Sequence, residues 1–270
     1  MKRIFAMLLA LLLVCSLVAC GEKEDEDDQD IDLTVTNDGQ YHDVGGAYND
    51  RFAYKIINGN QVAITGFVSD YTPHDVVIPT TIEECPVVEI ADSAFYHCSQ
   101  LRSITIPSAV KSIGKMAFSG CTQLAEVKYE GNVSNIALIG DLAFAYCKSL
   151  ATITLPNTVT TLGMGAFLEC EALATINVPA VVRGDGGVVV SGVTTLPDMV
   201  FMGCESLATV TGGEGIEVIG DYAFRGCAKL TSMTLPASLT KIGDYGFSGC
   251  TSFAVPTLGD GVTVGEFAFE

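Results

Sequence analysis

The chain has 270 residues and a formal net charge of −18, with 14 Lys and Arg against 32 Asp and Glu. Basic residues that are so few and so scattered argue against nucleic acid as a partner, and against binding to anionic lipid through a basic surface. The 28 glycines and the absence of long helical periodicity favour one elongated domain built of many short turns.

Residues 1–19 are predicted to be a lipoprotein signal peptide. Lys2 and Arg3 precede an apolar stretch, residues 4–18, that is shorter than the roughly 20 residues of a transmembrane helix. The stretch ends in Leu-Val-Ala-Cys, which resembles a bacterial lipobox. That resemblance implies cleavage before Cys20 and a diacylglycerol on its thiol, which would anchor the protein stably. The alternative is an ordinary signal peptide followed by an incidental cysteine.

Residues 20–50 are predicted to be a disordered linker that begins with the lipidated cysteine. Residues 21–32 contain eight acidic residues and one lysine, which repel one another and cannot form a core. We interpret the run as a solvated spacer; calcium binding is the alternative. An acidic run directly after the lipid-bearing cysteine also resembles the surface-export signal of some Gram-negative lipoproteins, which implies a location on the cell exterior.

Residues 51–75 are predicted to form an N-terminal β cap. Apolar and polar residues alternate on both sides of the turn signal Asn58-Gly59-Asn60, with Phe52 and Tyr54 before it and Val62 and Ile64 after it. Such a pattern is typical of a β-hairpin. We expect it to cover the open end of the repeat array that follows.

Residues 76–270 are predicted to be a repeat array. Phe followed three residues later by Cys occurs seven times, and Phe269 begins an eighth unit. The phenylalanines are spaced by 23, 26, 23, 34, 23, 23 and 22 residues. A period in this range indicates a repeat architecture. The seven pairs are Phe95/Cys98, Phe118/Cys121, Phe144/Cys147, Phe167/Cys170, Phe201/Cys204, Phe224/Cys227 and Phe247/Cys250.

Each unit is predicted to be one coil. A short alternating strand such as 103–106 ends at a proline, which cannot donate to a β-ladder. A glycine then follows, and we expect it to turn the chain at positive φ. The Ala-Phe-x-x-Cys segment is expected to be a single turn of α- or 3₁₀-helix. The corner glycines are Gly114, Gly140, Gly163, Gly220 and Gly243.

Stacking is expected to stabilise the array, because no unit can bury its Leu, Ile and Phe alone. Each such side chain contributes roughly 1.5–3 kcal/mol when it is fully buried. Like residues of successive coils therefore form interior columns. The pattern predicts a right-handed solenoid with a parallel sheet along one face.

The unit, Leu-x-x-Ile-x-Ile-Pro…Ile-Gly-x-x-Ala-Phe-x-x-Cys, resembles the BspA-like class of leucine-rich repeat. The resemblance implies a leucine-rich-repeat right-handed superhelix, mainly of short parallel β-strands. It also implies a bacterial surface protein of a class implicated in adhesion. Insertions before Phe144 and Phe201 depart from the pattern, and so does Gly212, which stands where the strand should end in Ile or Leu.

The insertion before Phe201 adds eleven residues within 179–197, since the interval there is 34 instead of 23. Two valine-rich flanks suggest a hairpin with Arg183, Gly184 and Asp185 at its tip. An exposed Arg-Gly-Asp loop resembles integrin-binding sites, which implies partner binding through Arg183 and Asp185. The alternative is that Asp-Gly is simply a favoured hairpin turn. Smaller insertions are expected near 135–138 and 83–86.

The outward strand positions are predicted to form a hydroxyl-rich stripe on the concave sheet, suited to a protein or glycan partner. The alternative is that threonine favours strands for its own sake. The stripe also includes Glu126 and Lys128. Its candidate partner-binding residues are Ser103, Thr105, Thr152, Thr154, Thr175, Asn177, Thr209, Thr211, Ser232 and Thr234.

No catalytic residues, metal site or cofactor are predicted. The repeat cysteines share one phase of the coil and form no Cys-x-x-Cys pair, so we interpret them as small buried side chains. The three histidines accompany no nucleophile motif. These observations predict a lipid-anchored surface protein that binds a host or neighbouring-cell surface or matrix protein, or a glycan. The alternative is a scaffold that presents a region beyond Glu270.

Overall fold

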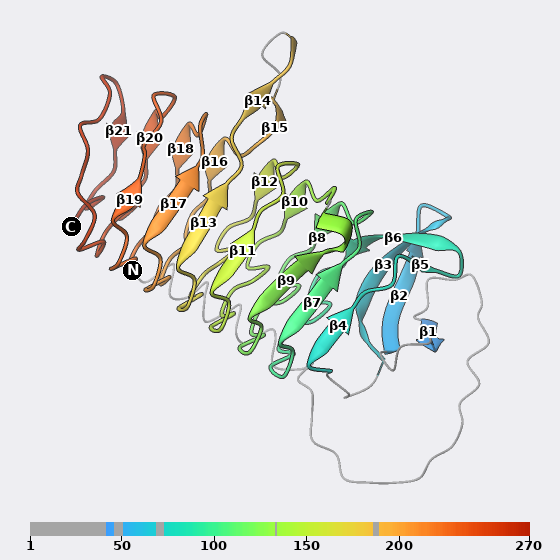
Figure 1. The fold of residues 1–270 in the computed structure, drawn as a ribbon. Coiled ribbons are helices and arrows are strands. Elements are labelled where there is room, and N and C mark those ends of the chain that lie inside the picture. The colour runs from blue at the N-terminus through green and yellow to red at the C-terminus, as the bar shows by residue number, and fades with distance from the viewer. Residues whose placement is uncertain (1–41, 46–50, 69–72, 133, 186–188) are drawn as a thin grey trace.

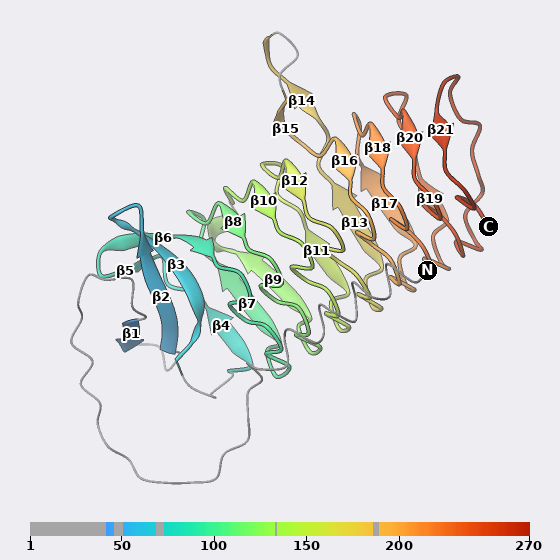
Figure 2. The ribbon, with the colours of Figure 1, turned by 180° about the vertical axis from the view of Figure 1, so that it is seen from behind.

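The computed structural model describes residues 42–45, 51–68, 73–132, 134–185 and 189–270. The predicted signal peptide, Cys20 and most of the predicted linker lie outside the described residues. The rest of the chain is a solenoid whose coils stack along one axis, with β-strands running down two sides (Figures 1 and 2). The predicted repeat solenoid is therefore confirmed.

The predicted N-terminal hairpin is also confirmed. Strands β2 (Arg51–Ile57) and β3 (Gln61–Phe67) pair antiparallel, and β1 (His42–Gly45) adds to the outer side of β2. Strand β1 lies within residues 20–50, so the prediction of a disordered linker is wrong at His42–Gly45, where the chain pairs with the hairpin. Strand β3 then pairs in parallel with β6 (Cys85–Ile90), the first strand of the array on that side. The hairpin thus extends one sheet of the solenoid and covers its first coil.

The longer strands form one side of the solenoid, in two parallel sheets. Where these strands are most regular, the outward side chains alternate with buried Ile and Val, as the sequence predicts. The first sheet contains β4 (Asp75–Val77), β7 (Ser103–Ile106) and β9 (Glu126–Tyr129), and the second contains β11 (Thr152–Thr154), β13 (Thr175–Val178), β17 (Thr209–Gly212) and β19 (Ser232–Met233).

Shorter strands form the other side, and they also pair in parallel from coil to coil. Strand β5 (Thr81–Ile82) makes a small antiparallel hairpin with β6 at the 83–86 insertion. The short strands that follow β6 are β8 (Ser112–Ile113), β10 (Leu138–Ile139), β12 (Thr161–Leu162), β16 (Thr195–Leu196), β18 (Val218–Ile219), β20 (Lys241–Ile242) and β21 (Thr263–Val264).

Each of the two later insertions interrupts one sheet. The coil with the three-residue insertion contains the short 3₁₀ helix η1 (Glu130–Asn132), and the long-strand ladder stops at β9 and resumes at β11. The eleven-residue insertion contains β14 (Val182–Arg183) and β15 (Val189–Ser191), and the short-strand ladder stops at β12 and resumes at β16. The interruptions fall at different coils, so one ladder remains continuous past each of them.

The core consists of columns of identical side chains. The repeat phenylalanines are almost fully buried and their rings stack from coil to coil, with centroids 5.0–5.6 Å apart from Phe95 to Phe247. At the N-terminal end the column continues through Phe67 of the hairpin, whose ring centroid lies 5.0 Å from that of Phe95. The predicted interior columns are therefore confirmed.

The prediction of positive φ at the corner glycines is wrong. Gly114, Gly140, Gly163, Gly220 and Gly243 are absent from the described glycines with positive φ, which lie at other positions. These glycines are needed because each packs against the backbone of the preceding coil. A Cβ atom on Gly163, for example, would lie 2.2 Å from the Asp141 nitrogen. The left-handed residue stands two positions later, as at Met116 (φ 53°) and Tyr222 (φ 59°).

The Ala-Phe-x-x-Cys segment is a series of hydrogen-bonded turns instead of a helical turn. In the second unit the Ala117 N–H donates to the Gly114 carbonyl (3.3 Å) and the Cys121 N–H to the Phe118 carbonyl (3.1 Å). The left-handed residues Met116 and Gly120 (φ 79°) prevent a helix from continuing. The Phe118 N–H instead donates to Ala143 of the next coil (2.7 Å), so the turns also join neighbouring coils.

Candidate functional site

The second long-strand sheet carries the most regular exposed surface. Two rows of the predicted stripe lie in register across its strands: Thr152, Thr175, Thr209 and Ser232 in one row, and Thr154, Asn177 and Thr211 in the other. Thr234 lies just past the end of β19 and is exposed. We call these eight residues the threonine face.

The threonine face is uncharged, and its side chains are exposed except for the half-buried Thr209. In the described part of the chain, one side-chain hydrogen bond joins two of its members, from Thr211 Oγ1 to Asn177 Oδ1 (3.1 Å). The other hydroxyls are therefore available to a ligand. Because the strands are held by the ladder and by the buried residues beneath them, the face is preorganised.

The first part of the predicted stripe differs from the threonine face. Ser103 and Thr105 are half-buried on β7, and the Ser103 hydroxyl donates to Asp75 Oδ1 (2.6 Å). Lys128 and Glu126 form an ion pair on β9 (2.7 Å). The structure therefore divides the ten predicted residues between a partly charged sheet and a separate neutral one. The gap between them coincides with the three-residue insertion.

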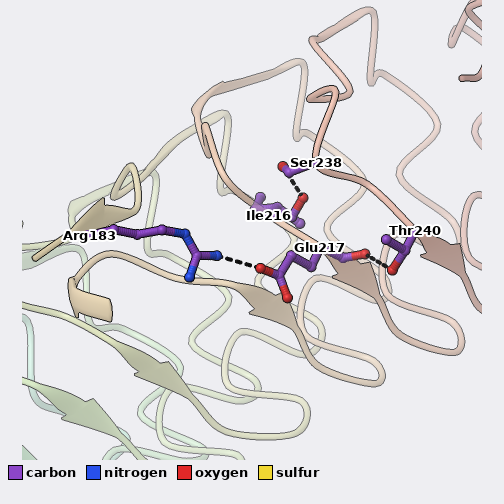
Figure 3. A network of polar contacts seen from close by, with 5 residues as sticks. All are labelled: Arg183, Ile216, Glu217, Ser238 and Thr240. Carbon is purple, nitrogen blue, oxygen red and sulfur yellow. Dashed lines mark hydrogen bonds and ion pairs between the residues drawn. The ribbon is translucent and has the colours of Figure 1, made fainter. Parts of the chain in front are cut away.

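The large insertion forms the predicted hairpin, which projects from the solenoid (Figures 1 and 2). Arg183 is the last residue of β14, and Gly184 and Asp185 follow it in exposed positions. The Arg183 guanidinium donates to Glu217 Oε1 (2.5 Å), as Figure 3 shows. The arginine side chain therefore points toward the coil that follows the insertion. Both side chains of this ion pair are nearly half exposed.

The coil that follows holds Glu217 in place. The Thr240 hydroxyl and N–H both donate to the Glu217 carbonyl, at 2.9 and 2.8 Å, and the Ser238 hydroxyl donates to the Ile216 carbonyl at 2.7 Å (Figure 3). Sequence reasoning missed Glu217, which is 34 residues from Arg183. No local signal marks this pair, because the contact depends on how the insertion leaves the stack.

A column of aspartates was also missed. An aspartate stands three residues before the phenylalanine in five units, and each carboxylate accepts a hydrogen bond from a backbone N–H of the following coil, as from Lys115 to Asp92 (2.7 Å). Its fixed phase in the repeat could have revealed it. The column joins successive coils through these hydrogen bonds. Its members are Asp92, Asp141, Asp198, Asp221 and Asp244.

The seven repeat cysteines are buried and, within the described ranges, none is in a disulfide, which confirms their predicted packing role. From Cys121 onward, each thiol donates to the carbonyl of the phenylalanine in the preceding coil, as from Cys121 Sγ to the Phe95 oxygen (3.1 Å). Burial raises the pKa of Cys170 from 9.0 to about 12. Within the described ranges, no group of three potential metal ligands is present.

The buried thiols predict a loss of stability at alkaline pH. Between pH 9 and about 12 the unfolded Cys170 thiol loses its proton while the folded one keeps it, so the free energy of unfolding falls as pH rises. Urea unfolding at about pH 8 and about pH 11 measures the loss. Cys170→Ala should reduce the pH dependence, which buried tyrosines also contribute to. If the free energy of unfolding of Cys170→Ala depended on pH as strongly as that of the wild type, the contribution of the Cys170 thiol would be wrong.

The described ranges contain no helix with the length and apolar character that a bilayer span requires.

Comparison with known families matches residues 75–184 and 188–270 to the family described as "BspA type Leucine rich repeat region". No curated protein matches the chain.

Two solved structures resemble the solenoid. A leucine-rich repeat protein from T. pallidum is 30% identical, with a TM-score of 0.64, and the match covers 80% of this chain and 95% of that one. A leucine-rich repeat protein from Bacteroides ovatus is 26% identical, with a TM-score of 0.56; the match covers 82% of this chain and 61% of the other.

Proposed function

Since the chain belongs to the BspA-type leucine-rich repeat family, we propose that it is a non-catalytic binding protein anchored to the bacterial cell surface. Its partner is a surface or matrix protein of a host or of a neighbouring cell. Repeat solenoids present long rigid surfaces, and proteins of this architecture use them for binding.

The threonine face carries this proposal. It spans four strands in register without a charged side chain, although the whole chain has a net charge of −18. A neutral face has no ions to desolvate when a partner covers it. Threonine side chains also lose little conformational freedom on binding, because their χ1 angles are already restricted in strands.

The lipid anchor is the second part of the proposal. The lipobox-like residues 17–20 support lipidation of Cys20, and the acidic run supports a spacer between the membrane and the array. The membrane contact is thus made by acyl chains. Mass spectrometry of the protein extracted from membranes is expected to give a mature N-terminus at Cys20 with acyl chains attached. An unmodified Cys20 would contradict the anchor and leave the binding role intact.

The binding role is tested by retention of the detergent-extracted protein on immobilised matrix proteins and cell-surface extracts. Thr175→Asp combined with Thr209→Asp places two charges in the centre of the threonine face. We expect it to weaken retention at least about tenfold, because a partner would have to desolvate unpaired carboxylates.

Thr195→Asp is the matched control. Thr195 is an exposed threonine on β16, in the sheet on the other side of the solenoid, so this variant should bind as the wild type does. Equal retention of both variants would exclude the threonine face. Retention on deglycosylated extracts identifies a protein partner, whereas its loss there identifies a glycan.

A further inference from the structure

We infer that Arg183 is a positioning residue that holds the β14–β15 hairpin against the solenoid through Glu217, and not a ligand-contacting residue of the Arg-Gly-Asp tripeptide. The inference is independent of the proposed function. It concerns the eleven-residue insertion, whose role neither the repeat pattern nor the core explains.

The hairpin has little to hold it in place by itself. Strands β14 and β15 form a separate two-stranded sheet, and their register shifts between Val182 and Arg183. Val182 and Val190 are 52% and 58% exposed, so these side chains bury little apolar surface. Isolated two-stranded hairpins are marginally stable in water. A defined orientation therefore needs contacts with the body of the solenoid.

Two such contacts lead to the same neighbouring segment. The Val181 N–H donates to the Glu214 carbonyl (2.7 Å) at the base of β14. Two residues further on, the Arg183 guanidinium pairs with the carboxylate of Glu217. Glu217 is itself fixed through its carbonyl by Thr240 (Figure 3). Together the contacts hold this side of the hairpin just before β14 begins and at the last residue of β14.

This arrangement separates the two charges of the tripeptide. The guanidinium of Arg183 is bound to a carboxylate of the same chain, and Asp185 stands exposed beyond the end of β14. A partner that required both charges would first have to break the Arg183–Glu217 pair. An arginine that anchors the hairpin, followed by residues that favour a hairpin turn, is sufficient to explain the Arg-Gly-Asp tripeptide.

Hydrogen–deuterium exchange of the full chain, read on peptides that cover β14 and β15, tests the inference. Arg183→Ala and Glu217→Gln should each raise exchange in these strands by about two- to fivefold, the range expected from losing one exposed ion pair. The charge swap Arg183→Glu with Glu217→Arg should restore slow exchange. Glu214→Gln is the control, because Glu214 contacts the hairpin through its carbonyl and should change nothing.

The two possible roles of Arg183 predict different results for the two single variants, Arg183→Ala and Glu217→Gln. If Arg183 is an anchor, Arg183→Ala and Glu217→Gln raise exchange in β14 and β15 equally, and the charge swap restores slow exchange. A ligand residue makes them differ: an Arg-Gly-Asp-binding integrin ectodomain would be captured better by Glu217→Gln and not at all by Arg183→Ala. That second result, or unchanged exchange in both single variants, would overturn the inference.

Discussion

Replacing Phe167 by alanine is expected to lower the free energy of unfolding by about 3–5 kcal/mol, the range for large-to-small substitutions of buried phenylalanine. Its ring is fully buried in the middle of the column, 5.5 Å from the Phe144 ring and 5.6 Å from the Phe201 ring. Neighbours on both sides are fixed by their own coils, so the cavity cannot collapse. Urea unfolding followed by circular dichroism measures the change.

Phe267→Ala is the matched control for this prediction. Phe267 stacks on Tyr245 at 5.1 Å, but it lies on the outer surface and is 46% exposed. Its removal should cost about 1 kcal/mol, as expected for a half-exposed aromatic side chain. Equal losses in the two variants would mean that the interior column does not dominate stability.

Gly163→Ala is expected to lower the free energy of unfolding about as much as Phe167→Ala does. The added methyl group would lie 2.2 Å from the Asp141 nitrogen and 2.3 Å from the Gly140 carbonyl carbon, both of them backbone atoms of the preceding coil. The coils would have to separate, and the hydrogen bond from the Gly163 N–H to the Ile139 carbonyl (2.7 Å) would weaken. We expect a loss of more than about 3 kcal/mol, or failure to fold. Urea unfolding and soluble yield report it.

Gly259→Ala provides the comparison, because no atom other than those of Gly259 and its two chain neighbours lies within 4 Å of the position its Cβ would take. Its φ is outside the left-handed range, so alanine fits without strain and should change stability by no more than a gain of about 0.4–1 kcal/mol. If Gly163→Ala were tolerated as well as Gly259→Ala, the close approach of successive coils at the glycine corner would be wrong.

Both substitutions act on the contact between coils, and the candidate binding surface depends on that contact. The threonine face exists only because Thr152, Thr175, Thr209 and Ser232 come from four successive strands held in register. A variant that loosens the stack is therefore expected to weaken partner binding even when it lies in the interior. The charge-introducing variants of the face test binding without this complication, because they leave the columns intact.

The sequence by itself determined the properties that repeat within each unit. The 23-residue spacing of Phe and Cys sets which side chains share an interior column, and the alternation in strands such as 152–154 sets which residues face solvent. The turn at Asn58-Gly59-Asn60 specified the first hairpin, and the valine flanks specified the second. These features are local, because each residue's place in the coil follows from its position in the unit.

Only the tertiary structure decided how one coil meets the next. The corner glycines such as Gly163 are required by a neighbouring backbone and not by their own φ, which no pattern within a unit reveals. The ladder breaks beside the insertions, so the predicted stripe became two surfaces. The partner of Arg183 is Glu217 because the insertion leaves the stack next to the following coil. Contacts of this kind depend on the relative placement of whole coils, and insertions shift that placement without changing the repeat.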